Sequence, residues 1–227
     1  MVVSLQAIGY MLVRPAVSYR IIAEKRPLFW PFVITTLPGL AVIPFYIQGF
    51  QPVIPSELQA EILGPGDQVP FLVGGIAAGA IWGSLLIMLL QAGLAAFFLT
   101  FWSHKVPFTT LFSLTIVSSS PYLLRVLVGV LLLNLGLIDY YSYETATSLA
   151  GFLGLTPATT RSFLYVLLVS VDAVALWTLA LFTGGLGSIG KVSLAARGTI
   201  AGLLWLLIVV MPRWFSFHSD GAPLLFH

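Results

Sequence analysis

The chain contains no cysteine and only three histidines among its 227 residues. Without cysteine there can be no disulfide, no thiolate metal ligand and no cysteine nucleophile. His104, His218 and His227 lie outside the apolar segments, so none is placed to activate a serine inside a membrane or to share a metal ion with the others. The sequence therefore predicts a protein that is not an enzyme and that binds no metal or cofactor.

Charge is also scarce. Only 8% of the residues are charged, 59% are hydrophobic, and the mean hydropathy is +1.02. Soluble domains carry about 25% charged residues, so this composition indicates a chain solvated mainly by a lipid bilayer. The net charge is +2 and the isoelectric point is near 9.0. Membrane topology accounts for this basic excess, and no nucleic-acid partner is expected.

Five apolar segments occur between the charges, and a transmembrane helix needs about 20 apolar residues. We therefore expect an all-α polytopic membrane protein. A five-helix transmembrane bundle, residues 28–211, would follow an N-terminal segment, residues 1–27, and precede a short external tail, residues 212–227. The five predicted spans are approximately residues 28–47, 71–101, 121–138, 162–182 and 194–211.

The sign of the charge alternates from one connection to the next. Basic loops stay in the cytoplasm, so the pattern predicts an N-terminus inside and a C-terminus outside. Eight of the ten basic residues then lie inside and six of the eight acids outside. The basic residues are Arg14, Arg20, Lys25, Arg26, Lys105, Arg125, Lys191 and Arg197, and the acids are Glu57, Glu61, Asp67, Asp139, Glu144 and Asp220.

Residues 2–22 are predicted to form an amphipathic helix, which Pro15 breaks or kinks. The segment is too polar to span a membrane. It lies either in the cytoplasmic interface, with its basic residues at the lipid headgroups, or across the cytoplasmic ends of the bundle. Its apolar positions recur at spacings of three and four and are Ile8, Met11, Leu12, Pro15, Tyr19 and Ile22.

The second predicted span is longer than a bilayer requires, so this helix must tilt, bend or protrude. Its first half carries Gly75, Gly79 and Gly83 four residues apart, a spacing that forms a groove for close helix packing. We expect this groove to pack within the chain, with a contact between two copies as the alternative. Residues 109–120 are richer in serine and threonine and are predicted to be a re-entrant or interfacial segment.

Asp172 lies in the middle of the fourth predicted span. A carboxyl group there must be paired, protonated or hydrated, and it marks a candidate functional site. Arg125, at the start of the third span, is the candidate partner. Either Asp172 fixes helix packing, or it serves an ion or proton path together with other polar groups. Those groups are Ser118, Ser119, Ser120, Asn134 and Ser170.

Several loose motifs follow one another between residues 15 and 210. They are Pro15, Arg26-Pro27, Trp82-Gly83 to Leu99, Thr109 to Ser120 with Pro121-Tyr122-Leu123-Leu124, Asp172 to Trp177 with Leu181, Gly187, and Lys191 to Gly198. In order and spacing this set resembles the Yip1 family of five-span membrane proteins. The prolines and basic residues before the first span also fit that family.

The resemblance implies a localisation and a general kind of function. Eukaryotic Yip1 members reside in Golgi and endoplasmic-reticulum membranes and associate with Rab-type GTPases through a long N-terminal region. Only about 27 residues precede the first span here, which implies a prokaryotic-type member in the plasma membrane. Some bacterial relatives look like accessory subunits of ABC-type exporters.

The expected function is therefore that of a scaffold or accessory subunit for other membrane proteins, in an exporter of this kind or in a trafficking or assembly complex. Homo-oligomers are a further possibility that the sequence leaves open. The alternative function is a small ion, proton or solute transporter or channel built around Asp172.

Overall fold

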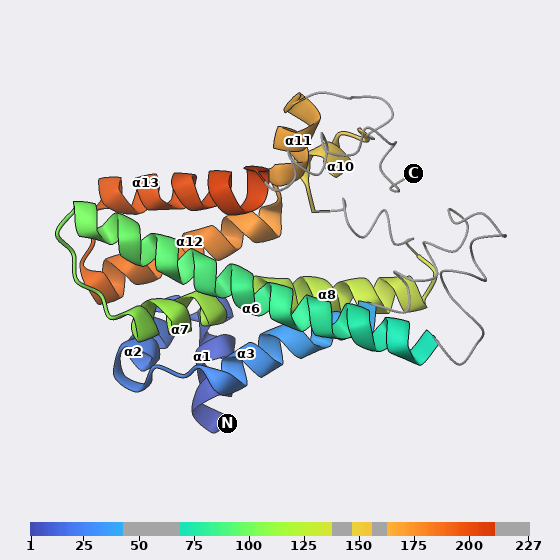
Figure 1. The fold of residues 1–227 in the computed structure, drawn as a ribbon, viewed down its shortest axis with the longest axis horizontal. Helices are drawn as coiled ribbons and strands as arrows, with labels where there is room; N and C mark the ends of the chain where they lie inside the picture. The colour runs from blue at the N-terminus through green and yellow to red at the C-terminus, as the bar shows by residue number, and fades with distance from the viewer. Residues whose placement is uncertain (43–68, 138–146, 156–162, 212–227) are drawn as a thin grey trace.

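The computed structural model describes residues 1–42, 69–137, 147–155 and 163–211, and the regular structure within these ranges is helical (Figure 1). The α-helices are α1 (Val2–Val13), α2 (Pro15–Lys25), α3 (Phe29–Thr36), α6 (Val69–Phe101), α7 (Phe108–Ser118), α8 (Ser120–Asn134), α10 (Leu149–Phe152), α11 (Phe163–Ser170), α12 (Ala173–Gly190) and α13 (Leu194–Leu204). A 3-10 helix, Leu37–Val42, continues α3, and a π-helix, Trp205–Val210, continues α13.

Some sequence predictions fall outside the described residues. They concern the end of the first predicted span, the acidic connections, and the external tail. These are residues 43–47, 48–68, 139–146 and 212–227.

Three helical stretches in the described part of the chain are long and apolar enough to cross a membrane. They are Ala77–Phe101 in α6, Phe108–Asn134 formed by α7 and α8, and Ala173–Gly190, which is α12. Two more apolar stretches, Phe29–Ala41 and Leu194–Val210, are shorter. The described residues thus confirm the predicted all-helical class and include three helical stretches of membrane-spanning length. The five-span bundle stays a prediction.

The long helices lie side by side, and the short connections between them lie at one end of the bundle (Figure 1). The end of α6, the start of α7, the end of α12 and the start of α13 all lie at the left end of Figure 1, and α1 and α2 pack near this end. The short connections at this end, residues 102–107 and 191–193, carry Lys105 and Lys191. The fold thus gathers basic connections at one end of the bundle.

The N-terminal segment forms two helices that pack against each other and against the bundle. Pro15 begins α2, where its missing N–H costs no hydrogen bond. The Ser18 hydroxyl donates to the Ala7 carbonyl at 2.7 Å, and the Tyr19 hydroxyl donates to the Leu181 carbonyl in α12 at 2.7 Å. Burial raises the pKa of Tyr19. Packing on the bundle, one of the two alternatives, is what the structure shows.

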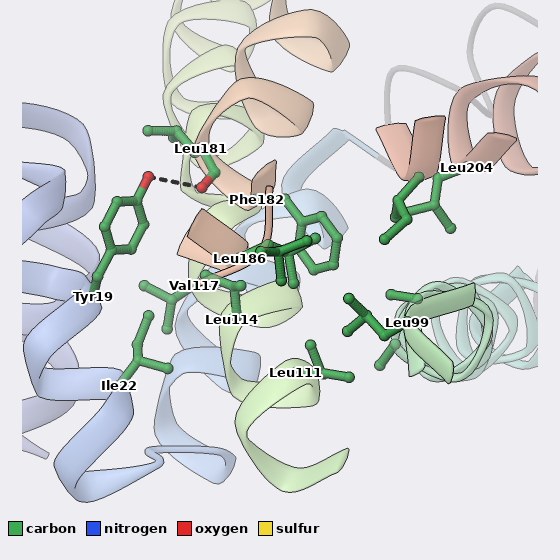
Figure 2. Close-up of a cluster of buried hydrophobic side chains, with 14 of the residues drawn as sticks. Tyr19, Ile22, Leu99, Leu111, Leu114, Val117, Leu181, Phe182, Leu186 and Leu204 are labelled. Carbon is green, nitrogen blue, oxygen red and sulfur yellow. Dashed lines mark hydrogen bonds between the residues drawn. The ribbon is translucent and has the colours of Figure 1, made fainter. Parts of the chain in front are cut away.

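Among the described residues, a hydrophobic core joins α1, α2, α6, α7, α12 and α13, and Figure 2 shows part of it. Phe182 and Leu186 of α12 lie against Leu114 of α7 in this core, and Leu99 of α6 packs from the opposite side. Each of these side chains is at most 1% exposed. Burial of one such side chain contributes about 1.5–3 kcal/mol in water, whereas in lipid the gain comes mainly from close packing.

Residues 109–120 differ from their prediction, because they form a helix, α7, that continues into α8 with a break at Ser119. Three of the hydroxyls that suggested an interfacial segment are satisfied locally: Thr115 donates to the Leu111 carbonyl, and Ser118 and Ser119 both donate to the Thr115 carbonyl. The Ser113 hydroxyl donates to the Pro27 carbonyl at 2.8 Å. A hydroxyl bonded to its own helix no longer resists an apolar environment. The membrane-length stretch therefore begins at Phe108, 13 residues before the predicted start of this span.

Candidate functional site

Asp172 lies at a helix break and not inside a continuous helix. The chain leaves α11 at Ser170 and enters α12 at Ala173, and Asp172 is the N-terminal capping residue of α12, with an extended backbone (φ −105°, ψ 130°). The fourth predicted span, residues 162–182, is therefore divided. The stretch of membrane-spanning length is α12, which begins after Asp172 and extends to Gly190.

The Asp172 carboxylate is 2% exposed and accepts hydrogen bonds on both oxygens. Oδ1 accepts from the backbone N–H groups of Val174 and Ala175, each at 2.9 Å, as expected for an N-capping aspartate. Oδ2 accepts from the Thr147 hydroxyl at 2.5 Å. The negative charge thus lies at the positive end of the α12 dipole, where it is favoured.

Arg125 completes the cluster, as the sequence analysis predicted. Its Nη1 atom lies 3.6 Å from Asp172 Oδ2, and its side chain is 13% exposed. Because α7 and α8 form one long stretch, Arg125 lies well inside it and not at its start. The pair therefore joins α8 to the beginning of α12.

Backbone contacts hold this break in place from two sides. The Leu149 N–H donates to the Val171 carbonyl and the Ala173 N–H donates to the Thr147 carbonyl, both at 2.9 Å. From the π-helix, Trp205 Nε1 donates to the Ser170 carbonyl at 3.0 Å. The backbone groups freed by the break are thus paired with other protein groups, as a broken helix in a membrane requires.

The other polar residues proposed for an ion path do not gather around Asp172. Asn134 is exposed and donates to the Val130 carbonyl of its own helix. Ser118 and Ser119 bond to their own helix. Ser120 and Ser170 are buried, and their hydroxyls have no partner among the described residues.

The glycines at positions 75, 79 and 83 do not pack against another described helix. Gly75 and Gly79 are exposed, Gly83 is half-buried, and a Cβ built at any of the three would meet no atom within 4 Å. Packing within the chain, the expected alternative, is not found in the described ranges. The contact between copies or with another protein stays a prediction.

The close glycine contacts occur instead on α12, where the sequence analysis did not expect them. A Cβ at Gly185 would overlap Leu114 of α7, one at Gly187 would overlap Arg197 of α13, and one at Gly184 would lie 2.7 Å from the Tyr19 hydroxyl. The predicted fourth span ended at residue 182, before the run Gly184-Gly185-Leu186-Gly187. In the structure this run continues α12, and three neighbours approach its glycines closely.

Sequence analysis also missed a cavity of about 470 Å³ where the helices meet. Its lining comes from α3, α6, the α7–α8 junction, α12 and the π-helix. Threonine, serine, glutamine and tyrosine occur there among aliphatic residues. These polar residues are Thr35, Thr36, Ser84, Gln91, Ser119, Tyr122 and Thr178.

The sequence signal that could have revealed this cavity is weak, because these residues are widely spaced polar positions in apolar segments.

Within the part of the chain that the structure describes, no group of three histidine, aspartate or glutamate side chains could hold a metal ion. No family model matches the chain, and neither a curated protein nor a solved structure matches it.

Proposed function

We propose that this chain crosses the membrane five times, with its N-terminus in the cytoplasm and its C-terminus outside, and that it acts without catalysis by binding other membrane proteins. It would be a scaffold or accessory subunit of Yip1 type in a prokaryotic plasma membrane. An ABC-type exporter and a trafficking or assembly complex are the candidate assemblies. The gathering of basic connections at one end of the bundle supports this topology.

The observation that carries the binding function is the open face of α6. Gly75, Gly79 and Gly83 meet no described side chain, and small residues at this spacing let a second helix approach closely in lipid. Large apolar side chains lie beside them on the same helix: Trp82, which precedes Gly83, is 63% exposed, and Leu86 is 62% exposed. This face offers a groove with bulky contacts beside it for a partner helix.

The contacts of Asp172 support a structural role for this residue. Its two oxygens hold two backbone N–H groups, the Thr147 hydroxyl and the Arg125 guanidinium. An ion-carrying carboxylate needs a site that it can offer to a cation. A fixed charge at a helix N-terminus, paired with arginine, is already neutralised. The transporter alternative is correspondingly less well supported.

The test is purification of the whole chain in mild detergent, followed by mass spectrometry of what accompanies it. We expect either a stoichiometric membrane-protein partner or a homo-oligomer. Gly79→Leu fills the groove and should abolish the association. Val128→Phe adds similar bulk on the exposed face of α8 and should not. A wild-type chain recovered only as a monomer without partners, or an association that survives Gly79→Leu, would contradict the proposal.

A further inference from the structure

The cavity between the helices is not explained by a scaffold function. Five helical segments far apart in sequence all contribute to its wall. Its volume of about 470 Å³ falls within the 300–1,000 Å³ typical of small-molecule sites. No charged side chain occurs among the described residues that line it, and the Arg125–Asp172 pair lies outside this lining.

Two threonine hydroxyls at this cavity have no partner in the described part of the chain. Thr36 of α3 is 9% exposed and Thr178 of α12 is 7% exposed, and neither Oγ1 atom makes a hydrogen bond there. Both residues line the cavity, as does Gln91 of α6, which is 9% exposed. A buried hydroxyl without a partner is unfavourable, so a ligand that bonds to both threonines would gain free energy.

Other threonines in these helices show that the missing bonds are not a general feature. Their hydroxyls donate to the carbonyl four residues earlier, the usual solution in an apolar helix. Such bonds are present at Thr35, Thr115, Thr183 and Thr199. Thr36 and Thr178 have the same local option and do not use it.

Helix geometry changes at the cavity wall as well. Gly39 lies in the 3-10 helix that continues α3, Ser119 lies at the break between α7 and α8, and Ile208 lies in the π-helix that continues α13. All three residues line the cavity. Irregular backbone at membrane depth is tolerated where it faces protein or a cavity, and π-helical turns are frequent at functional sites.

We propose that this cavity binds one uncharged molecule that combines hydroxyl or carbonyl oxygens with an apolar portion. Rotation about χ1 would turn the buried Oγ1 atoms of Thr36 and Thr178 to its oxygens, and side chains such as Met88 and Leu204 would contact its apolar portion. A charged ligand is disfavoured, because its charge would have no counter-charge in the wall. A neutral glycerolipid from the bilayer has this chemistry, whereas a small polyol such as glycerol lacks the apolar portion.

The test is native mass spectrometry of the whole chain, titrated with dioctanoylglycerol or, in a separate series, with glycerol. We expect one saturable dioctanoylglycerol per chain. Saturation by glycerol and not by dioctanoylglycerol would contradict the proposal, because glycerol has no apolar portion.

Thr36→Val and Thr178→Val each keep the side-chain shape and remove one hydroxyl. Each should weaken binding roughly fivefold, the effect of one lost hydrogen bond. Thr183→Val is the matched control on the same helix, because the Thr183 hydroxyl bonds to its own backbone and does not line the cavity. Absence of dioctanoylglycerol binding would overturn the proposal. Equal binding by the wild type and both cavity variants would also overturn it, because the two hydroxyls would then not hold the ligand.

Discussion

A carboxylate within an apolar bundle depends on the donors that the protein supplies. Asp172 takes its donors from the start of α12, from Thr147 before α10 and from Arg125 in α8. One residue thus joins three parts of the chain that are separate in sequence. The residue type and the arginine partner were predictable, because a membrane carboxylate needs a counter-charge. Its capping role was not, because an apolar run on both sides of Asp172 suggested an uninterrupted helix.

Substitution of Asp172 separates a structural role from a transport role. Asp172→Leu removes the cap and leaves Arg125 without its partner, so we expect the free energy of unfolding to fall by roughly 3–5 kcal/mol. Asp172→Asn keeps the shape and the acceptor oxygen for Val174 and Ala175, so the loss should be smaller and partner binding should persist. Thermal unfolding in detergent and co-purification measure both effects.

Asn134→Leu is the control for the Asp172 variants, because Asn134 is exposed and bonds only within its own helix among the described contacts. It should leave stability nearly unchanged. If Asp172→Asn folds normally and abolishes an ion or proton flux in liposomes, the structural role is wrong and the transporter function stands.

Tyr19 gives a second test at the scale of one residue. Tyr19→Phe removes the hydrogen bond to Leu181 that ties α2 to α12, and we expect a loss of about 1 kcal/mol in unfolding free energy. Burial raises the pKa of Tyr19 above its unfolded value, so the neutral phenol is favoured in the fold. Its contribution is complete below about pH 10 and declines as the pH rises through the folded pKa.

Unfolding measured across alkaline pH should therefore show a loss of stability in the wild type that is smaller in Tyr19→Phe. An identical alkaline profile for the two proteins would show that another group causes the loss.

At the scale of the elements, hydropathy predicted where the long helices lie. Their ends were predicted less well, because hydroxyl-rich and glycine-rich segments were excluded from the spans. Residues 109–120 were predicted to be interfacial from their hydroxyls, yet the hydroxyls of Thr115, Ser118 and Ser119 bond to their own helix. Gly184, Gly185 and Gly187 lie beyond the predicted end of the fourth span, yet they belong to α12 and are positions where it meets its neighbours. Both errors share a cause: composition does not show which acceptor a hydroxyl bonds to, or which neighbouring side chain lies so close that only glycine fits.

The glycines of α12 and α6 should respond in opposite ways to the same substitution. Gly185→Ala places a Cβ against Leu114 in the core between α12 and α7, and overpacking of this kind costs about 1–3 kcal/mol. Gly83→Ala meets open space and should be neutral or slightly stabilising, because alanine favours a helix by about 1 kcal/mol over glycine. Thermal unfolding of the two variants in the same detergent measures the difference. Equal destabilisation would contradict the packing described for α12.

At the scale of the whole molecule, the charge pattern and the arrangement of the helices agree. The connections that carry Lys105 and Lys191 lie at one end of the bundle, near the N-terminal helices (Figure 1). The cavity could not be predicted, because its wall combines single residues from five segments. Periodicity within one segment contains no information on such a site.

The cavity wall includes residues of α3 and of the π-helix, so the cavity lies within a membrane-embedded bundle only if the first and last segments also cross the bilayer. Cysteine labelling tests this directly, because the chain contains no native cysteine. Single cysteines at positions 14, 105 and 191 would be probed in intact cells with a membrane-impermeant maleimide, and a cysteine at position 67 would serve as the external control.

The five-span account predicts that position 67 is labelled from outside and that positions 14, 105 and 191 are labelled only after the cells are opened. If only the three long helices cross, position 14 lies on the side opposite to positions 105 and 191. Labelling of position 14 on the side opposite to position 105 would contradict the account.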